Sequence, residues 1–287
     1  MNAIKTAGRY KLLEKRAHGP VVFELVVEAP VIAGSCEPGQ FVIVRADETG
    51  ERIPLTIADF DRARGSVTLV IQVVGASSEK IAGFNPGDSY LDVVGPLGKK
   101  SDIEKFGTVV TIGGGLGIAP VYPIQRALKE AGNRIISIIG ARSSDIIFWD
   151  DRMKATSDEL IVATDDGSRG EKGFVTEILK RLIASGTKVD RVIAIGPAIM
   201  MKAVTGVTKP LGIPTIVSLN SIMVDGTGMC GGCRVEVDGK TMFTCVDGPE
   251  FDAKDVNFDL LLSRLGTYRD EEKISRDHCK CSQKGAK

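Results

Sequence analysis

The chain has 287 residues, which is enough for two domains and a smaller appendage rather than one core. Apolar residues make up 43%, charged residues make up 26%, and the formal net charge is zero. No basic stripe, apolar membrane segment or signal core is present, so we expect a globular cytoplasmic protein with no nucleic-acid or membrane partner.

Residues 1–98 have the pattern of a small antiparallel β-barrel or sandwich. Short apolar segments alternate with turn-forming segments rich in Gly, Pro, Asn and Asp, at the spacing of short strands. The expected strands cover residues 21–27, 41–44, 67–74 and 90–94.

Residues 99–219 change character, since apolar strands now alternate with helical patterns. Such alternation predicts a parallel, doubly wound sheet, and the fully apolar strands fit a sheet covered on both faces. The expected strands are 109–112, 135–139, 160–163, 192–195 and 215–218, and the expected helices are 121–131, 174–183 and 200–207.

A glycine-rich loop, residues 113–117, joins the first of these strands to a helix. Glycines allow close approach of a ligand, and the helix N-terminus then offers an anion site suited to a pyrophosphate. The spacing is not a true G-x-G-x-x-G fingerprint, and a tight turn without a ligand is the alternative. The second strand leads into Arg142 and Ser143 rather than an acidic ribose partner, so NAD and NADP both stay open.

Residues 220–248 are rich in Gly, Cys and Asp, and end in an expected hairpin around Asp238 and Gly239. The spacing Asp-x4-Cys-x2-Cys-x11-Cys, formed by Asp225, Cys230, Cys233 and Cys245, approaches that of plant-type [2Fe–2S] sites. We therefore predict a [2Fe–2S] cluster with a carboxylate in the first ligand position. Zinc, or buried thiols with Asp225 as a turn residue, are the alternatives.

The remaining cysteines and the histidines do not form a recognisable site. Cys36 is expected to be a buried side chain or a loop thiol, and Cys279 with Cys281 to be an incidental pair in a polar tail. His18 and His278 belong to no catalytic constellation, so no catalytic side chain is predicted.

Taken in order, these three parts resemble the ferredoxin–NADP reductase-like electron-transfer subunits over nearly the whole chain. The resemblance implies a FAD-binding barrel over 1–98, an NAD-binding α/β domain over 99–219, and a [2Fe–2S] domain with a tail over 220–287. It implies FAD contacts in the segment that resembles Arg-Pro-x-Ser/Thr and in a second barrel segment. These are Arg52, Pro54, Leu55, Thr56, Val70, Ile71, Gln72, Ser77 and Ser78.

The same resemblance implies that NAD(H) docks on the glycine loop and on two further βα loops. The implied contacts are Gly114, Gly115, Gly117, Ile118, Ala119, Pro120, Asp166, Gly196, Pro197 and Met200. FAD then exchanges electron pairs with the nicotinamide and single electrons with the cluster, which makes the chain an NAD(P)H-dependent oxidoreductase subunit.

Within this family the aspartate at position 225 and the extended tail resemble the small subunits of ferredoxin:NADP+ oxidoreductases more than four-cysteine dihydroorotate dehydrogenase subunits. That implies a larger iron–sulfur flavoprotein partner, electron bifurcation, an indirect link to ferredoxin and NADP, and an apolar surface near the cluster. A dihydroorotate dehydrogenase subunit and a stand-alone NADH-dependent reductase are the alternatives.

Overall fold

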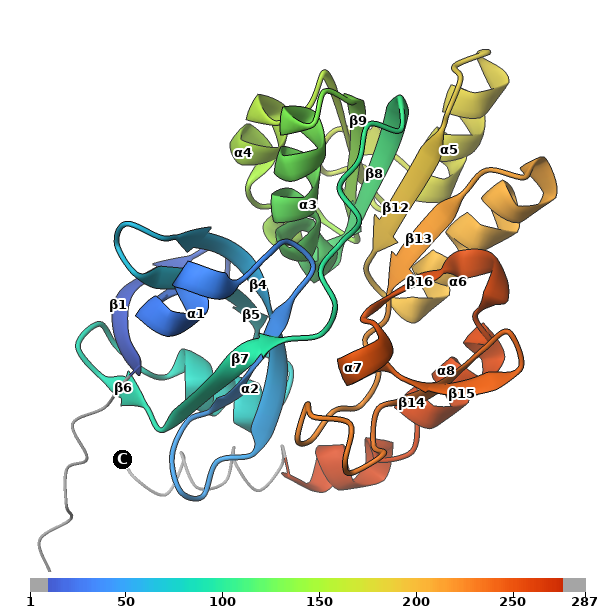
Figure 1. Ribbon diagram of the computed structural model, residues 1–287. Helices are drawn as coiled ribbons and strands as arrows, with labels where there is room; N and C mark the ends of the chain where they lie inside the picture. The colour runs from blue at the N-terminus through green and yellow to red at the C-terminus, as the bar shows by residue number, and fades with distance from the viewer. Residues whose placement is uncertain (1–9, 276–287) are drawn as a thin grey trace, which may run out of the picture.

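A computed structural model describes residues 10–275 of the chain. It consists of a β-barrel, a nucleotide-type α/β sheet above it, and a small C-terminal part beside both (Figure 1). His278, Cys279 and Cys281 lie outside the described residues. Within residues 10–275, no helix combines the length and apolar character needed to span a membrane.

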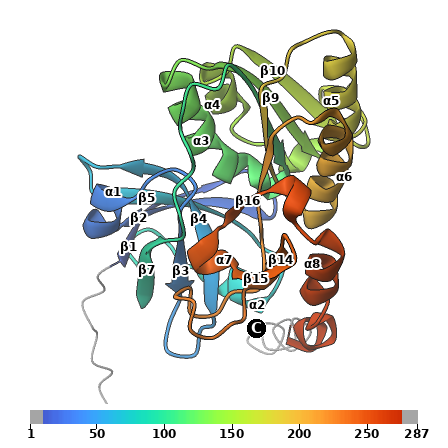
Figure 2. The ribbon, with the colours of Figure 1, turned by 45° about the vertical axis from the view of Figure 1, so that its right-hand side comes forward.

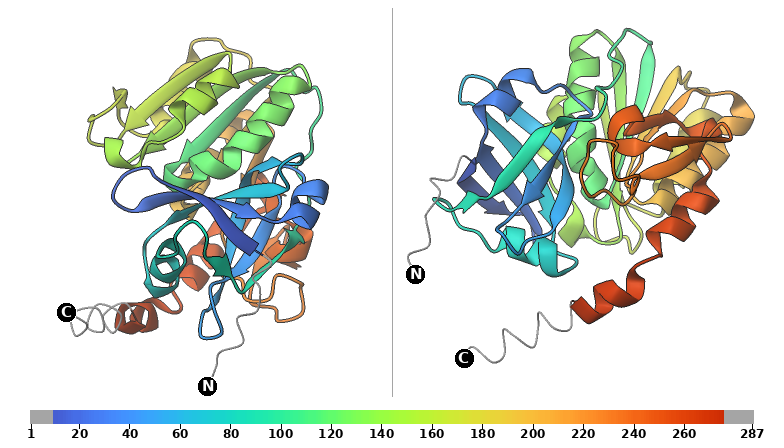
Figure 3. Two further views of the ribbon diagram at one scale, coloured as in Figure 1. Left: turned by 90° about the vertical axis from the view of Figure 1, so that its left-hand side faces the viewer. Right: turned by 60° about the horizontal axis from the view of Figure 1, so that its bottom comes forward.

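The barrel is a seven-stranded antiparallel sheet in the order β6-β1-β2-β5-β4-β3-β7, curved around one apolar core (Figure 3). The predicted antiparallel barrel is confirmed. Its strands are β1 (Tyr10–Ala17), β2 (Val22–Glu28), β3 (Phe41–Arg45), β4 (Arg52–Asp61), β5 (Ser66–Gln72), β6 (Ser89–Tyr90) and β7 (Asp92–Leu97), and its helices are α1 (Pro30–Ser35) and α2 (Ala76–Ala82).

The sequence did not predict β1, β4 or the two barrel helices. Strand β1 carries charged residues on its open side, and β4 contains Pro54, so neither forms a continuous apolar run. Cys36, which follows α1, is fully buried in the barrel core, and burial raises the pKa of its thiol to about 11. It is therefore a packing residue.

The second sheet has the order β11-β10-β9-β8-β12-β13-β16 and is parallel except for its last strand. The predicted doubly wound sheet is confirmed. Its strands are β8 (Thr108–Gly114), β9 (Arg134–Ala141), β10 (Glu159–Thr164), β11 (Glu171–Lys172), β12 (Arg191–Ile195), β13 (Thr215–Ser218) and β16 (Glu250–Asp252), with helices α3 (Ile118–Glu130), α4 (Asp150–Ala155), α5 (Val175–Ala184) and α6 (Ala198–Thr208) and 3-10 turns η1 (Gly115–Gly117), η2 (Ser144–Ile146) and η3 (Lys209–Leu211).

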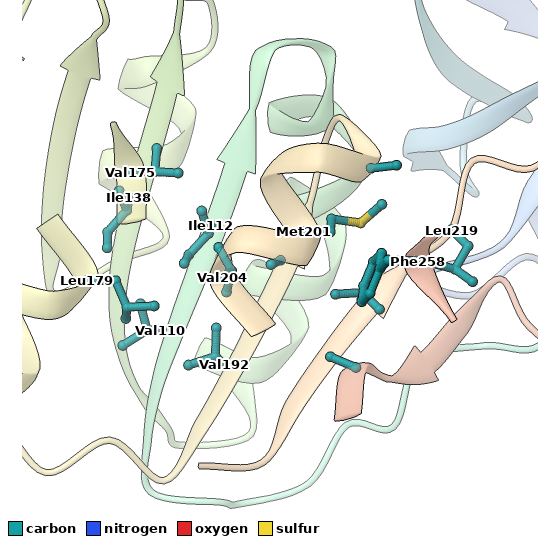
Figure 4. Packing of buried hydrophobic residues seen from close by; sticks show 14 of the residues in the cluster. Val110, Ile112, Ile138, Val175, Leu179, Val192, Met201, Val204, Leu219 and Phe258 are labelled. Atoms are coloured by element: carbon teal, nitrogen blue, oxygen red, sulfur yellow. The ribbon is translucent and has the colours of Figure 1, made fainter. Parts of the chain in front are cut away.

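Both faces of this sheet are covered, because successive side chains of each strand point to opposite faces. Val109 packs on the side of α3, α4 and the barrel, whereas Val110 packs on the side of α5 and α6. Figure 4 shows the second of these cores, where Met201 and Val204 of α6 lie over the sheet. The apolar strands of the sequence follow from this double burial.

The predicted small C-terminal domain is confirmed, and it also adds one strand to the second sheet. Its hairpin joins β14 (Arg234–Val237) and β15 (Lys240–Phe243) through Asp238 and Gly239, which both have positive φ, at 52° and 68°. After α7 (Thr244–Asp247), β16 pairs antiparallel with β13. The chain continues through η4 (Ala253–Asp255) to α8 (Phe258–Leu265), which packs beside α6 (Figure 2).

A buried carboxylate links the barrel to the nucleotide-type domain. Glu24 of β2 is only 2% exposed, and its Oε2 accepts hydrogen bonds from His18 Nε2 at 2.7 Å and from Trp149 Nε1 at 2.9 Å. Arg152 of α4 donates to its other oxygen at 3.4 Å. Burial alone raises the pKa of Glu24, but the hydrogen bonds from His18 and Trp149 outweigh it and hold the pKa below its usual value.

Candidate functional site

One large cleft lies where the barrel, the nucleotide-type sheet and the segment after β13 meet. Its volume is about 1040 Å³, and it is lined from all three parts of the chain. The predicted cofactor-binding residues that line it are Pro54, Leu55, Thr56, Val70, Gln72, Gly114, Gly115, Gly117, Ala119, Pro120, Gly196, Pro197 and Met200.

Strand alternation explains which barrel residues reach the cleft. On β5, Val70 and Gln72 line it, whereas Ile71 between them is buried in the barrel core. On β4, the same alternation places Arg52 on the face of Pro54 and Thr56. Arg52 is exposed, however, and is not among the residues that line the cleft.

The two serines predicted at the start of α2 have different environments. Ser77 lines a second cavity of about 530 Å³ together with Glu51 and Lys80. The hydroxyl of Ser78 accepts hydrogen bonds from the N–H groups of Val74 and Gly75, each at 2.9 Å. Ser78 therefore caps its own helix, while the Ser77 hydroxyl donates a hydrogen bond to Glu51 in the wall of the second cavity.

The opposite wall is the glycine loop, in which β8 ends at Gly114 and α3 begins at Ile118. A Cβ on Gly117 would lie 2.0 Å from the carbonyl oxygen of Ile195, so only glycine lets the loop pass this close to β12. Ile118 turns away from the cleft and is fully buried in the core under α3. The N-terminal turn of α3, including Ala119 and Pro120, faces the cleft, as an anion site requires.

At the carboxyl end of β10, the predicted contact Asp166 does not line the cleft, but its neighbour Asp165 does. Asp166 is exposed and binds the N–H and hydroxyl of Ser168. These hydrogen bonds from Ser168 hold the pKa of Asp166 below its usual value.

Sequence reasoning missed several lining residues altogether. They include Phe41, Arg142, Phe174, Asn220, Ser221 and Met223. Arg142 had a usable signal, because it follows the carboxyl end of β9, where ligands of parallel sheets bind. Ser221 belongs to no motif, and only the fold brings it to the cleft.

The four predicted metal ligands lie on neighbouring segments, but they do not all converge. Cys233 and Cys245 are buried, with their sulfur atoms 3.1 Å apart. Burial, and next the hydrogen bond from Cys233, raise the pKa of the Cys245 thiol to about 12. Cys230 is exposed.

Asp225 uses its carboxylate within its own loop. Its Oδ1 accepts from the N–H of Thr227 and its Oδ2 from the N–H of Cys230, both at 2.9 Å, and the first of these is the main reason that its pKa lies below its usual value. Among residues 10–275, no group of three or more His, Cys, Asp or Glu side chains is arranged to hold a metal ion.

The residues present nevertheless fit the predicted groups. Three thiols and one carboxylate are a suitable donor set for iron, and the loop that carries Asp225 and Cys230 has positive φ at Gly226, Gly228 and Gly231. The cleft has mostly apolar walls, a glycine turn at a helix N-terminus, and the buried hydroxyl of Ser221, which has no hydrogen-bond partner among the described residues. A flavin and a nicotinamide fit such a site.

Comparison with protein families identifies two parts of the chain. Residues 220–257 match the iron–sulfur cluster binding domain of dihydroorotate dehydrogenase B, and this segment contains all four predicted metal ligands. Residues 111–206 match an oxidoreductase NAD-binding domain, which includes the glycine loop.

Full-length relatives and a solved structure agree with these matches. A dihydroorotate dehydrogenase B (NAD(+)) electron transfer subunit homolog of Thermotoga maritima is 50% identical and aligns with 88% of this chain and 89% of its own. An electron transfer subunit of the same enzyme from Fusobacterium nucleatum is 35% identical, over 77% and 87%. One solved structure that resembles this chain is that of an NADH-dependent reduced ferredoxin-NADP oxidoreductase, described as giving insights into flavin-based electron bifurcation. The matching chain is 45% identical, with a TM-score of 0.90, and the match covers 96% of this chain and 99% of that chain.

Proposed function

Because the chain belongs to the ferredoxin–NADP reductase-like family of electron-transfer subunits that includes those of dihydroorotate dehydrogenase B, we propose that it serves flavin-based electron bifurcation. It is an electron-transfer subunit with FAD, NAD(H) and a [2Fe–2S] cluster as cofactors. In this role it is part of an NADH-dependent reduced ferredoxin–NADP oxidoreductase.

The observation that carries the proposal is the single cleft shared by the three parts of the chain. Thr56 and Gln72 face it from the barrel, and the loop at Gly115 and Gly117 faces it from the nucleotide-type domain. Met223, which also lines the cleft, packs in one apolar cluster with Cys233 and Cys245. A flavin in this cleft therefore lies between a nicotinamide site and the cluster loop, as a converter of electron pairs into single electrons requires.

We assign the residues as follows, with no acid–base side chain in the set. Arg52, Pro54, Leu55, Thr56, Val70, Gln72 and Ser77 hold FAD, while the glycine loop, Gly196, Pro197 and Met200 hold NAD(H). Asp225, Cys230, Cys233 and Cys245 hold the cluster. The protein binds and orients the groups, and FAD supplies the exchange between electron pairs and single electrons.

We favour NAD(H) over NADP(H) from the charges around the cleft. Arg142 is the one cationic side chain among the described lining residues, and Asp165 is an anionic one in the same lining. A 2′-phosphate is bound best by several cations, whereas a ribose hydroxyl is bound well by a carboxylate.

A larger partner subunit is part of the proposal. Val224, Met229 and Val246 lie next to three of the predicted cluster ligands and are 50%, 89% and 39% exposed. Exposed apolar side chains at an electron-transfer site fit a docked partner, which passes electrons on toward ferredoxin and NADP. We also propose that the chain divides into three domains after residues 98 and 219, and that the protein is cytoplasmic.

Isolation of the native complex through a tag on this chain tests the function. We expect a copurified iron–sulfur flavoprotein and activity that couples NADH, NADP+ and ferredoxin. Copurification with a flavoprotein that oxidises dihydroorotate, without ferredoxin coupling, would contradict the proposal and support the second candidate, which the names of the Thermotoga and Fusobacterium relatives favour. A chain that reduces ferredoxin at full rate without a partner would also contradict it.

A further inference from the structure

Ser221 has an unusual environment for a buried polar side chain. It is 7% exposed and lines the main cleft, and its hydroxyl has no hydrogen-bond partner among residues 10–275. Buried hydroxyls are nearly always hydrogen-bonded, because an unpaired one loses its interaction with water without replacement. We therefore expect the Ser221 hydroxyl to donate a hydrogen bond to a ligand in the cleft or to accept one from it.

The chain around Ser221 leads from the second sheet to the barrel, since Leu219 belongs to the core beside α6 and Met223 to the apolar cluster that contains Phe41. Leu219, Ser221 and Met223 are buried, whereas Asn220 and Val224 are exposed, so this segment follows the alternation of an extended strand. Within that cluster, Phe41 is directly opposite Thr56 in the β3–β4 pair. Two extended residues span at most about 7 Å, so Ser221 lies near the Thr56 end of the cleft.

The chemistry of a hydroxyl suits the edge of a flavin ring. The isoalloxazine edge has carbonyl oxygens and ring nitrogens that accept hydrogen bonds and one N–H that donates, and a serine hydroxyl both donates and accepts. We propose that Ser221 is a further FAD-binding residue, whose hydroxyl hydrogen-bonds the isoalloxazine edge on the side of the cluster loop. This inference rests on the proposed function, which assigns FAD to the cleft.

A hydrogen bond from Ser221 has a consequence for flavin reduction. Reduction makes the isoalloxazine edge richer in electrons, and a hydroxyl donor stabilises the more negative acceptor more strongly. Loss of the donor therefore weakens FAD binding and lowers the flavin midpoint potential.

The test compares Ser221→Ala with Ser137→Ala in the full chain. Ser137 is the other buried serine without a hydrogen-bond partner in the described part of the chain, but it lies within β9 and outside the cleft lining. For Ser221→Ala we expect the FAD dissociation constant to rise about threefold to tenfold, the net effect of one hydrogen bond, together with a lower flavin midpoint. Ser137→Ala should match the wild type in both.

A second pair of variants keeps the test valid if the alanine variant folds poorly. Ser221→Thr and Ser221→Val have the same shape and differ in the hydroxyl, so the threonine variant should bind FAD more tightly than the valine variant. Equal FAD affinity and equal midpoints within each pair would overturn the inference. So would a rise in the NADH dissociation constant alone, since the hydroxyl would then serve the nicotinamide. A wild-type chain that takes up no FAD would instead refute the proposed function itself.

Discussion

The carboxylate of Glu24 allows a quantitative test of how the two cofactor domains are held together. Glu24→Gln keeps the size of the side chain but removes its charge, and thereby weakens the hydrogen bonds from His18, Trp149 and Arg152. Removing one partner of a buried ion pair typically costs about 3–5 kcal/mol.

The expected cost here is smaller because Arg152 has other contacts. Its side chain is 33% exposed, and its guanidinium lies 3.6 Å from the Asp59 carboxylate and 4.4 Å from the ring centre of Trp149. We therefore expect Glu24→Gln to lower the free energy of unfolding by about 2–3 kcal/mol at neutral pH.

The pH dependence has a defined sign. The pKa of Glu24 is lower in the folded protein than its usual value of 4.5, so its contribution is present above that value. The contribution is lost as pH falls through the folded-state pKa. The difference between wild type and Glu24→Gln should therefore shrink in acid.

Urea unfolding followed by tryptophan fluorescence measures this effect, because Trp149 is the single tryptophan and contacts Glu24 directly. Glu14→Gln is the matched control, since Glu14 of β1 makes more exposed ion pairs with Arg16 and Arg64. Exposed pairs contribute little to stability, because water screens their charges. The reasoning would be refuted if Glu24→Gln and Glu14→Gln had the same stability.

Three further predictions concern the glycine loop, the buried carboxyl of β16 and the cluster loop. Gly117→Ala should lower the free energy of unfolding by about 1–3 kcal/mol and weaken NADH binding, because the new Cβ would lie 2.0 Å from the Ile195 carbonyl oxygen. Calorimetry measures the NADH affinity, and an unchanged affinity would contradict this prediction. Glu250 accepts a hydrogen bond from Ser101 at 2.5 Å, and burial raises its pKa to about 7. The free energy of unfolding should therefore fall by at most about 3 kcal/mol as pH rises from 4.5 to 7. Glu250→Gln should remove this pH dependence. The same pH dependence in the variant would show that another group titrates. Asp225→Cys should keep a [2Fe–2S] centre with a shifted midpoint potential, and an EPR signal and midpoint equal to wild type would exclude Asp225 as a ligand.

Much of the fold could be predicted because the buried strands are apolar on both faces. Val109 and Val110 pack on opposite sides of one sheet, so the strand appears in the sequence as an apolar run. By contrast, β4 has one open face and contains Pro54, and its pattern was missed. Strand β16 was missed because three residues are too few for a periodic pattern.

The site was predictable only where a local conformation needs particular residues. The loop at Gly117 carries such a signal, because a close backbone approach excludes any side chain. Asp165 follows the carboxyl end of β10, and this signal marks the loop but not which of Asp165 and Asp166 faces the cleft. Ser221 carries no signal, since the segment after β13 reaches the cleft only through tertiary packing. The ligand set that the cysteine spacing indicates stays a prediction, whereas the exposure of Cys230 beside the buried Cys233 and Cys245 depends on tertiary packing that spacing does not encode.

The most direct test of the central claim is an anaerobic titration of the purified chain with NADH, after its iron, acid-labile sulfide and flavin have been measured. The account predicts FAD with equal amounts of iron and sulfide, bleaching of the flavin absorbance by NADH, and a [2Fe–2S] EPR signal that appears as electrons reach the cluster. A colourless, zinc-containing protein without sulfide, or a bound flavin that NADH does not reduce, would contradict it.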